Sequence, residues 1–140
     1  MEETDTKLKC EIVTPEGLLV SGDVAMVVVP GDMGELGILP RHTPIVSKTG
    51  VGEVRIKHLA DGNWEHLAVG NGYVKMQFDR LLLLVDTAEK ATGIDTERAQ
   101  QALNRAEKYL ARAGESEVDA HRAEQSRRRA LNRLKVAGRT

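Results

Sequence analysis

Turn-forming residues are confined almost entirely to the first half of the chain, and this distribution constrains the fold more than any other feature of the sequence. All four prolines and ten of the thirteen glycines lie within the first 72 of the 140 residues. Residues 95–113 contain neither type and are rich in strong helix formers. We therefore expect an N-terminal part of short segments joined by turns and a C-terminal part of long helices.

The charge of the chain divides near the same point. Residues 1–88 carry eight Lys/Arg and thirteen Asp/Glu side chains, a net charge of −5, whereas residues 89–140 carry twelve and eight, a net charge of +4. The overall charge of −1 hides this asymmetry. We predict two domains, 1–88 and 89–140, and expect the basic domain to make contacts with partners.

The ends of the chain and its single cysteine bear on the cellular compartment. Residues 1–9 are polar and acidic, without the apolar core of a signal peptide. No apolar run approaches the ~18 residues of a membrane-spanning helix. One cysteine, Cys10, excludes an internal disulfide and suits a reducing compartment. We therefore expect a cytosolic protein that reaches a membrane only through a partner.

Residues 7–88 have the pattern of short β-strands. Leu8, Cys10 and Ile12 alternate with charged residues, which is typical of a half-buried strand. Further strands are expected over residues 18–20, 24–29, 51–58, 64–69, 73–78 and 81–85, with turns at 21–23 and 61–63. Turn signals every eight to twelve residues predict an all-β sandwich or flattened barrel with a mainly aliphatic core.

Residues 95–136 are expected to form two helices. The first carries a narrow apolar stripe: Ala99, Ala102, Leu103, Ala106, Leu110 and Ala113. Asp95 is predicted as its N-cap and Gly114 as the residue that ends it. The second is predicted to start at a weak capping box of Ser116 and Asp119, and its stripe is thinner: Val118, Ala123, Ala130, Leu131 and Leu134. Because alanines let helices approach closely, we predict an antiparallel two-helix hairpin.

The sequence shows no pattern of catalytic or metal-binding residues. The four histidines lie outside the spacings of metal ligands, and the glycines of residues 31–37 lack the Gly-Lys-Ser/Thr of a phosphate-binding loop. Cys10 points inward on a strand, where a thiol is usually inert packing. We predict no catalytic residue, no metal and no obligatory cofactor, and therefore a protein that is not an enzyme.

Arginines on the helices are the best candidates for ligand contacts. Arg98 and Arg105 share one face of the first helix, and Arg122, Arg129 and Arg133 share one face of the second. In an antiparallel hairpin the two rows converge, and guanidinium groups match phosphate or carboxylate oxygens well. A solvated basic face is the alternative, and the pattern alone leaves both open.

Residues 30–44 have the sequence PGDMGELGILPRHTP, which resembles the signature loop of the epsilon subunit of bacterial and chloroplast F-type ATP synthases. The surrounding order matches as well, with EIVTP at 11–15, GNGYV at 70–74 and LVDTAE at 84–89. Residues 94–99, IDTERA, fit the family's Ile/Leu-Asp-x-x-Arg-Ala nucleotide motif. The resemblance extends from about residue 7 to residue 136. One departure is the segment SKTG at 47–50, where many relatives have a Lys-Pro-Gly turn.

The resemblance implies a ten-stranded N-terminal β-sandwich, a C-terminal two-helix hairpin and a subunit without catalytic activity. It implies a place on the central rotor stalk, where the β domain binds the gamma subunit and the ring of c subunits and helps couple proton flow to ATP synthesis. By motif position, the contact residues are Glu35, Leu36, Gly37, Arg41 and His42. The implied location is peripheral, on the cytoplasmic face of the bacterial plasma membrane.

For the hairpin, the resemblance implies regulation. Folded on the sandwich the hairpin permits turnover, and extended along gamma into the alpha/beta catalytic head it blocks ATP hydrolysis. ATP is implied as a regulatory ligand that stabilises the folded state through its higher affinity for that state. By motif position, the nucleotide is surrounded by Glu89, Ile94, Asp95, Arg98, Arg105, Arg129 and Arg133.

A nucleic-acid-binding module is the main rival class. Proteins that bind single strands stack bases on exposed aromatic side chains within a basic groove. Here the N-terminal part is acidic and holds three aromatic residues, and the basic residues lie on helices without recognition signatures. We therefore predict no nucleic-acid partner.

Overall fold

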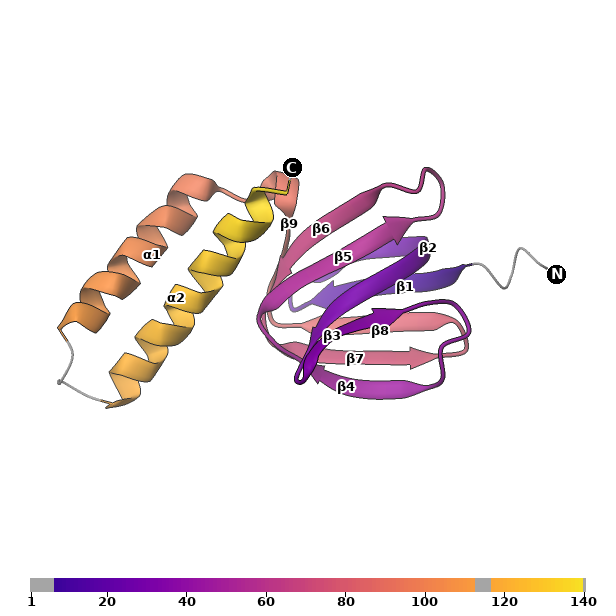
Figure 1. Ribbon diagram of the computed structural model, residues 1–140, viewed down its shortest axis with the longest axis horizontal. Coiled ribbons are helices and arrows are strands. Elements are labelled where there is room, and N and C mark those ends of the chain that lie inside the picture. The colour runs from indigo at the N-terminus through magenta and orange to yellow at the C-terminus, as the bar shows by residue number, and fades with distance from the viewer. Residues whose placement is uncertain (1–6, 113–116, 140) are drawn as a thin grey trace. The chain divides into compact units, whose positions relative to one another are not determined.

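The chain divides into two units, residues 1–90 and 91–140, and the computed structural model describes residues 7–112 and 117–139 (Figure 1). In its described part the first unit holds nine strands: β1 (Leu8–Thr14), β2 (Gly17–Gly31), β3 (Gly34–Ile38), β4 (Ile45–Thr49), β5 (Gly52–His58), β6 (Trp64–Val69), β7 (Gly72–Gln77), β8 (Arg80–Val85) and β9 (Ala88–Lys90). The second holds the short 3-10 helix η2 (Ala91–Gly93) and the helices α1 (Thr96–Ala111) and α2 (Glu117–Ala137).

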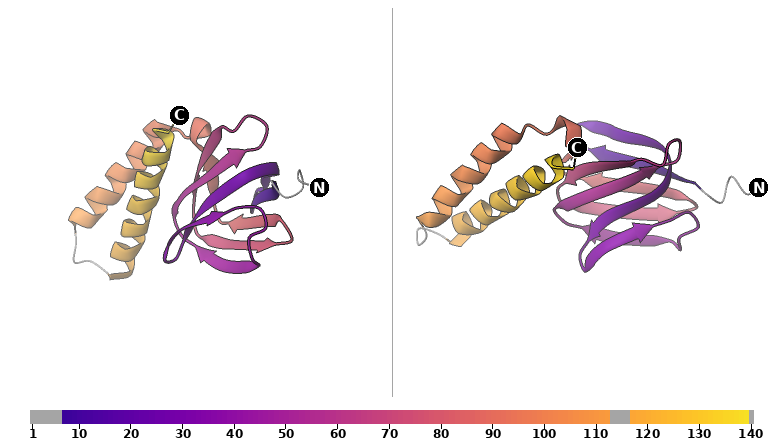
Figure 2. Two further views of the ribbon diagram at one scale, coloured as in Figure 1. Left: turned by 45° about the vertical axis from the view of Figure 1, so that its right-hand side comes forward. Right: turned by 45° about the horizontal axis from the view of Figure 1, so that its top comes forward.

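The strands form one continuous sheet that folds into the two layers of a β-sandwich, as predicted (Figure 2). The strand order is β1-β8-β7-β4-β2-β5-β6-β9, with β3 against β2 and a further pairing between β1 and β2. The strands β1 and β8 are parallel, and the other pairs are antiparallel. The 15-residue strand β2 pairs with β1 along residues 17–24 and with β3 and β5 along residues 24–31.

The core between the layers is aliphatic, as the composition predicts. Alternating residues of each strand point into it, and none of the core members is aromatic: Leu8, Cys10, Ile12, Val20, Val24, Val27, Val29, Ile38, Val54, Ile56, Leu67, Val69, Val74, Met76, Leu81, Leu83 and Val85. The three aromatic side chains of the sandwich, Trp64, Tyr73 and Phe78, are all exposed. The alternation of apolar residues along the strands therefore identifies the core, whereas the aromatic residues lie at the surface.

The strand boundaries differ from the sequence-based expectation in two ways. The predicted turn at residues 21–23 is wrong, because Ser21, Gly22 and Asp23 pair with residues of β1 and β2 continues through them. The strands β3, β4 and β9 were not predicted, and the described residues contain nine strands rather than the ten that the resemblance implies. The strand β9 also moves the end of the first unit from residue 88 to Lys90, because it pairs with β6.

One glycine in the GNGYV segment is required by the close approach of two strands. A Cβ atom on Gly72 would overlap the carbonyl oxygen of Leu84, its neighbour on β8. Because backbone atoms cannot move aside as a flexible side chain can, this position accepts glycine alone. The close packing of β7 on β8 thus explains the glycine at position 72 of this segment.

The second unit is an antiparallel pair of helices, as predicted (Figures 1 and 2). Small and aliphatic side chains are buried along it: Ala99, Leu103 and Ala106 on α1, and Ala123, Ala130 and Val136 on α2. Leu131 was expected in the second stripe but is 39% exposed. The predicted roles of Ala113, Gly114, Ser116 and the Val118 side chain lie outside the described residues.

Candidate functional site

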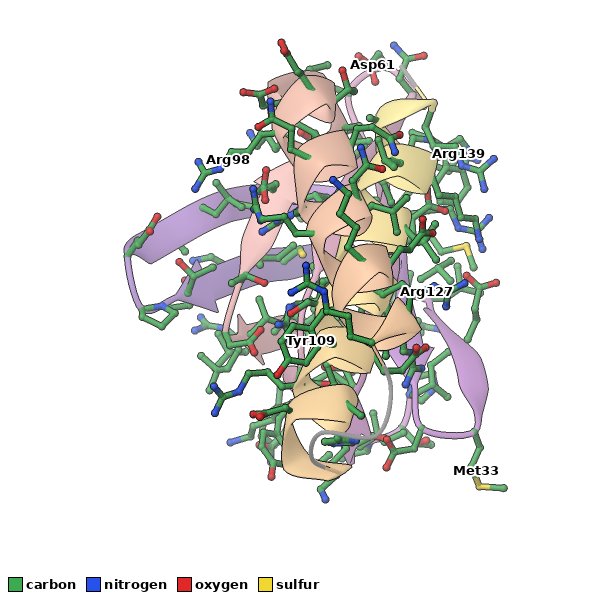
Figure 3. All side chains as sticks on the ribbon, turned by 90° about the vertical axis from the view of Figure 1, so that its left-hand side faces the viewer. Met33, Asp61, Arg98, Tyr109, Arg127 and Arg139 are labelled. Atoms are coloured by element: carbon green, nitrogen blue, oxygen red, sulfur yellow. The ribbon has the colours of Figure 1, made fainter. Side chains whose placement is uncertain are left out.

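The signature segment of residues 30–44 forms a hairpin and the loop that follows it. The strands β2 and β3 pair from Val27↔Ile38 to Gly31↔Gly34, which leaves Asp32 and Met33 at the turn. Gly34 has a φ of +119°, a conformation that favours glycine. Met33 is fully exposed and projects from the tip of the hairpin (Figure 3). The segment therefore presents a protruding tip followed by a strand.

Glu35, Leu36 and Gly37 lie on β3, where each has a different environment. Both carboxylate oxygens of Glu35 accept hydrogen bonds at 3.1 Å from Nη2 of Arg55 on β5. Leu36 is half-buried against the core, and Gly37 is exposed. The Glu35 carboxylate remains largely open to solvent, because its side chain is 59% exposed.

Arg41 and His42 lie in the loop after β3, and a different set of hydrogen bonds holds them. The backbone N–H of Arg41 donates to Oδ1 of Asp79 at 2.6 Å, in the turn between β7 and β8. The backbone N–H of His42 donates to the carbonyl of Leu39 at 3.1 Å, and its ring Nδ1 lies 2.7 Å from the carbonyl oxygen of Thr43. The five predicted contact residues therefore fall into two groups, one on β3 and one in the loop anchored to Asp79.

An outward-facing apolar row crosses the layer of β7, β8 and β1, and sequence reasoning missed it. Tyr73 pairs with Leu84, Leu84 with Val13, and Val13 with Leu18, so these side chains share one face. Tyr73, Leu84 and Leu18 are 54%, 47% and 57% exposed, and Val13 is half-buried. Only the strand register places them side by side, although each is an apolar residue at a solvent-facing position of its strand.

The start of α1 is built as its motif predicts. Oδ1 of Asp95 accepts a hydrogen bond from the backbone N–H of Arg98 at 3.0 Å, which confirms Asp95 as the N-cap. Ile94 is half-buried, and the Arg98 side chain is exposed. The Asp95 carboxylate thus already has a structural role before any ligand is considered.

A cleft of about 330 Å³ lies between α1 and α2. Its lining consists of Ala102, Arg105, Ala106, Tyr109, Asp119, Arg122, Ala123 and Ser126. Among the described residues this lining includes Arg105 from the predicted nucleotide set and also Arg122, so one arginine of each predicted row lies at the cleft. The Arg98 and Tyr109 side chains lie on one side of the hairpin, and Arg127 lies on the other (Figure 3).

The remaining predicted nucleotide residues are spread over the chain. Arg129 reaches the cleft indirectly, because its Nη2 donates to Oγ of Ser126 at 3.3 Å. Arg133 is half-buried on α2. Glu89 lies on β9, opposite Ala68, and so belongs to the first unit. Of the arginines in the two predicted rows, Arg105 and Arg122 therefore line the cleft directly, and the start of α1 contributes nothing to its lining.

Two of the histidines in the first unit lie beside glutamate carboxylates. His58 Nε2 lies 2.9 Å from Glu65 and His66 Nδ1 3.3 Å from Glu53. No three His, Cys, Asp or Glu side chains gather into a metal site within residues 7–112 and 117–139. In the same ranges, no helix combines the length and apolar character that crossing a bilayer requires.

A β-sandwich with an exposed apolar row, followed by a helical hairpin with two arginines at its cleft, defines a two-domain β-sandwich and hairpin protein. Two sequence families match it. One, described as "ATP synthase, Delta/Epsilon chain, beta-sandwich domain", matches residues 7–91. The other, described as "ATP synthase, Delta/Epsilon chain, long alpha-helix domain", matches residues 93–138.

Related proteins match this chain in sequence along nearly its whole length. The ATP synthase epsilon chain of Halalkalibacterium halodurans is 47% identical, covering 94% of this chain and 98% of its own. That of Desulforamulus reducens is 44% identical, covering 92% and 96%. The chain therefore belongs to the delta/epsilon family of ATP synthase chains, and it is an epsilon subunit, which is not itself catalytic.

Solved structures share the fold. A chain in the structure of the Euglena gracilis mitochondrial ATP synthase, described as "OSCP/F1/c-ring in rotational state 1", aligns with a TM-score of 0.81 at 16% identity, covering 96% of this chain and 82% of that one. A chain in the Tetrahymena thermophila mitochondrial "central stalk/cring" structure aligns with a TM-score of 0.62 at 12% identity, covering 92% and 95%. At these low sequence identities, the similarity shows a shared fold.

Proposed function

We propose that this chain is a rotor-stalk subunit whose N-terminal unit binds the gamma subunit and the ring of c subunits, and so helps couple proton flow to ATP synthesis. The apolar row of Leu18, Val13, Leu84 and Tyr73 carries the proposal. A contiguous apolar patch on a soluble domain marks an interaction surface. Because burying it excludes water from several aliphatic side chains at once, it suits a long-lived subunit contact better than a transient one.

The signature segment supplies the second contact of this proposal. Glu35, Leu36 and Gly37 follow the exposed tip at Met33, and Arg41 and His42 follow β3 in the anchored loop. We assign these five residues to contacts with the c ring and gamma. The Arg55 guanidinium orients the Glu35 carboxylate, which limits the entropy lost when a partner binds there.

A double substitution tests the gamma contact. We expect Tyr73→Ser with Leu84→Ser to weaken binding of the full chain to purified gamma by about tenfold or more, because two central apolar contacts are lost. Isothermal titration calorimetry measures this. Trp64→Ser, which removes an exposed aromatic side chain on β6, is the matched control and should bind normally. Unchanged binding by the double variant would place the gamma contact elsewhere.

The hairpin is assigned the regulatory part of this function. In its extended form it inhibits ATP hydrolysis by contacting the alpha/beta head, and ATP acts as a regulatory ligand of the folded hairpin rather than as an obligatory cofactor. The cleft supports a nucleotide site, because Arg105 and Arg122 supply charge for phosphate in excess of the single carboxylate of Asp119, and three alanines supply an apolar floor. Ligand binding to one form stabilises it by its difference in affinity.

Titration of the isolated chain with ATP tests the nucleotide site. We expect saturable binding in the millimolar range or tighter, and a loss of affinity of about tenfold for Arg105→Gln and for Arg122→Gln. Arg128→Gln is the control, because Arg128 is an exposed arginine outside the cleft lining. Absence of saturable binding to the unaltered chain would reject ATP as a ligand.

The location follows from the complex in this proposal. The chain is placed on the cytoplasmic face of the bacterial plasma membrane, held there through gamma and the c ring. The proposed function includes no nucleic-acid partner, because most basic residues lie on the hairpin, which is assigned to contacts with ATP and the alpha/beta head.

A further inference from the structure

The turn between β7 and β8 carries an aromatic residue where the backbone favours glycine or asparagine. Phe78 and Asp79 are the two residues between the strands, with φ of +53° and +56°. Positive φ at both positions is what the tightest hairpin turns require, and Asn-Gly is the usual solution. A bulky side chain in this conformation is an outlier. Local backbone preference therefore does not explain Phe78.

Packing does not explain Phe78 either. Its side chain is 84% exposed, so the ring contributes nothing to the core of the sandwich. Strained residues of this kind persist where the surrounding structure holds them, and they concentrate at functional positions. A solvated aromatic ring on a strained backbone points to a role outside the folded chain.

The surrounding backbone holds the turn firmly from two sides. Oδ1 of Asp79 accepts the N–H of Arg41 at 2.6 Å, and the carbonyl of Asp79 accepts the N–H of Lys9 at 2.9 Å. Arg41 itself has a φ of +67°. All three of the non-glycine residues with positive φ in the described part of the chain therefore meet here. The backbone that carries the Phe78 ring is consequently held in place, which lowers the backbone entropy lost on binding.

The neighbouring side chains are apolar and basic. Leu39, in the loop that the Arg41 hydrogen bond anchors, is 53% exposed. Lys9 and Arg80 are exposed and lie opposite each other on β1 and β8. The nearby carboxylate of Asp79 accepts the Arg41 N–H, and that of Asp23 lies 3.5 Å from Lys7. Asp23 is also the register partner of Lys9, so this end carries a modest excess of basic side chains rather than basic ones alone, although the domain as a whole is acidic.

We propose that the Phe78 turn is a docking anchor whose ring inserts into an apolar recess on an acidic protein segment of the rotor. Leu39 widens the apolar contact, and Lys9 and Arg80 face the carboxylates of that segment. Continuity supports the assignment, because Arg41 and His42 already belong to the proposed contact loop. The inference rests on the proposed function, which supplies the partner assembly, and adds the residue that anchors it.

Substitution of Phe78 separates anchoring from folding. Because asparagine tolerates positive φ, we expect Phe78→Asn to raise the thermal midpoint of the sandwich by about 4 °C or more, followed by the fluorescence of Trp64. The same variant should bind the gamma–c-ring assembly, stripped of this chain, about tenfold or more weakly. Phe78→Tyr should bind within about twofold of the unaltered chain, since it keeps the ring. Leu59→Ser, which removes an exposed apolar side chain in the β5–β6 turn, is the control and should leave binding unchanged.

The outcomes distinguish the inference from the function on which it rests. If the unaltered chain does not bind the stripped assembly, the rotor proposal fails. If it binds and Phe78→Asn binds equally well, the anchor alone is wrong. Arg80→Glu should weaken binding at low salt and less so at high salt, as an acidic partner requires. Phe78-dependent binding to anionic lipid vesicles that matches binding to the assembly would overturn the choice of a protein partner.

Discussion

Cys10 shows how completely single residues of the sandwich core are withdrawn from solvent. Its side chain has no exposed surface. Burial raises the pKa of the thiol to about 12, and the negative charges of Glu11 and Glu65 add to the shift. Because the thiolate is the reactive form, the group acts as a small apolar side chain.

The shifted pKa of Cys10 predicts a loss of stability at alkaline pH. Between pH 9, where the unfolded thiol ionises, and about pH 12, the unfolded chain has released a proton that the folded chain retains. The contribution is therefore complete below pH 9 and falls as the pH rises, by at most about 1.4 kcal/mol per pH unit. Urea unfolding at pH 8 to 11 measures it, and Cys10→Val should show a smaller decline. Identical pH profiles for the two chains would contradict the shift.

Residues whose roles depend on nearby sequence were predictable, and those that depend on register were not. Asp95 is a cap because its partner lies three residues away, so the local pattern contains the information. Glu35 meets Arg55 only because β2 brings β3 and β5 together, and Arg41 meets Asp79 across 38 residues. The positive φ of Phe78 is hidden from the sequence altogether, because its residue type argues against it.

At the scale of elements, the helices α1 and α2 pack against each other mainly through small side chains. Ala99, Ala106, Ala123 and Ala130 are buried there, so each contact removes little apolar surface from water. Because packing supplies most of the stability of a helix in a folded protein, a cap adds a smaller, local contribution to it.

Asp95→Ala should destabilise α1 by about 1 kcal/mol, because the N–H of Arg98 loses its side-chain acceptor. Far-UV circular dichroism during thermal unfolding measures the change, and Asp95→Ser, which preserves the cap, is the control. The same pair of variants tests the nucleotide assignment. A loss of ATP affinity in Asp95→Ser, with its helix intact, would show that the carboxylate also serves the ligand.

Strand prediction succeeded where alternation is regular and failed where pairing overrides local signals. The strands β5 and β7 follow apolar periods of two, whereas β8 is recognised as an unbroken aliphatic run and β6 ends in three buried residues. The Ser-Gly-Asp segment of residues 21–23 favours a turn locally, yet backbone pairing with β1 keeps it extended. The three-residue β9 has no period to detect, since it exists only through its pairing with β6.

At the scale of the whole molecule, the division after Lys90 predicts where the chain can be shortened. A chain that ends at residue 90 should fold, bind gamma and lose the ability to inhibit ATP hydrolysis, which an ATPase assay of the complex measures. A chain that ends at residue 87 should be less stable by about 2 kcal/mol, because it lacks the pairing of β9 with β6. If the longer truncated chain no longer assembled with gamma, the separation of docking from regulation would be wrong.

The strand β2 has a mechanical consequence for the N-terminal unit. Its first half is paired in one layer of the sandwich and its second half in the other. Sliding one layer over the other would therefore break backbone hydrogen bonds that β2 makes with its neighbouring strands, in addition to disturbing side-chain packing. The N-terminal unit should therefore resist shear between its two layers as one stiff body.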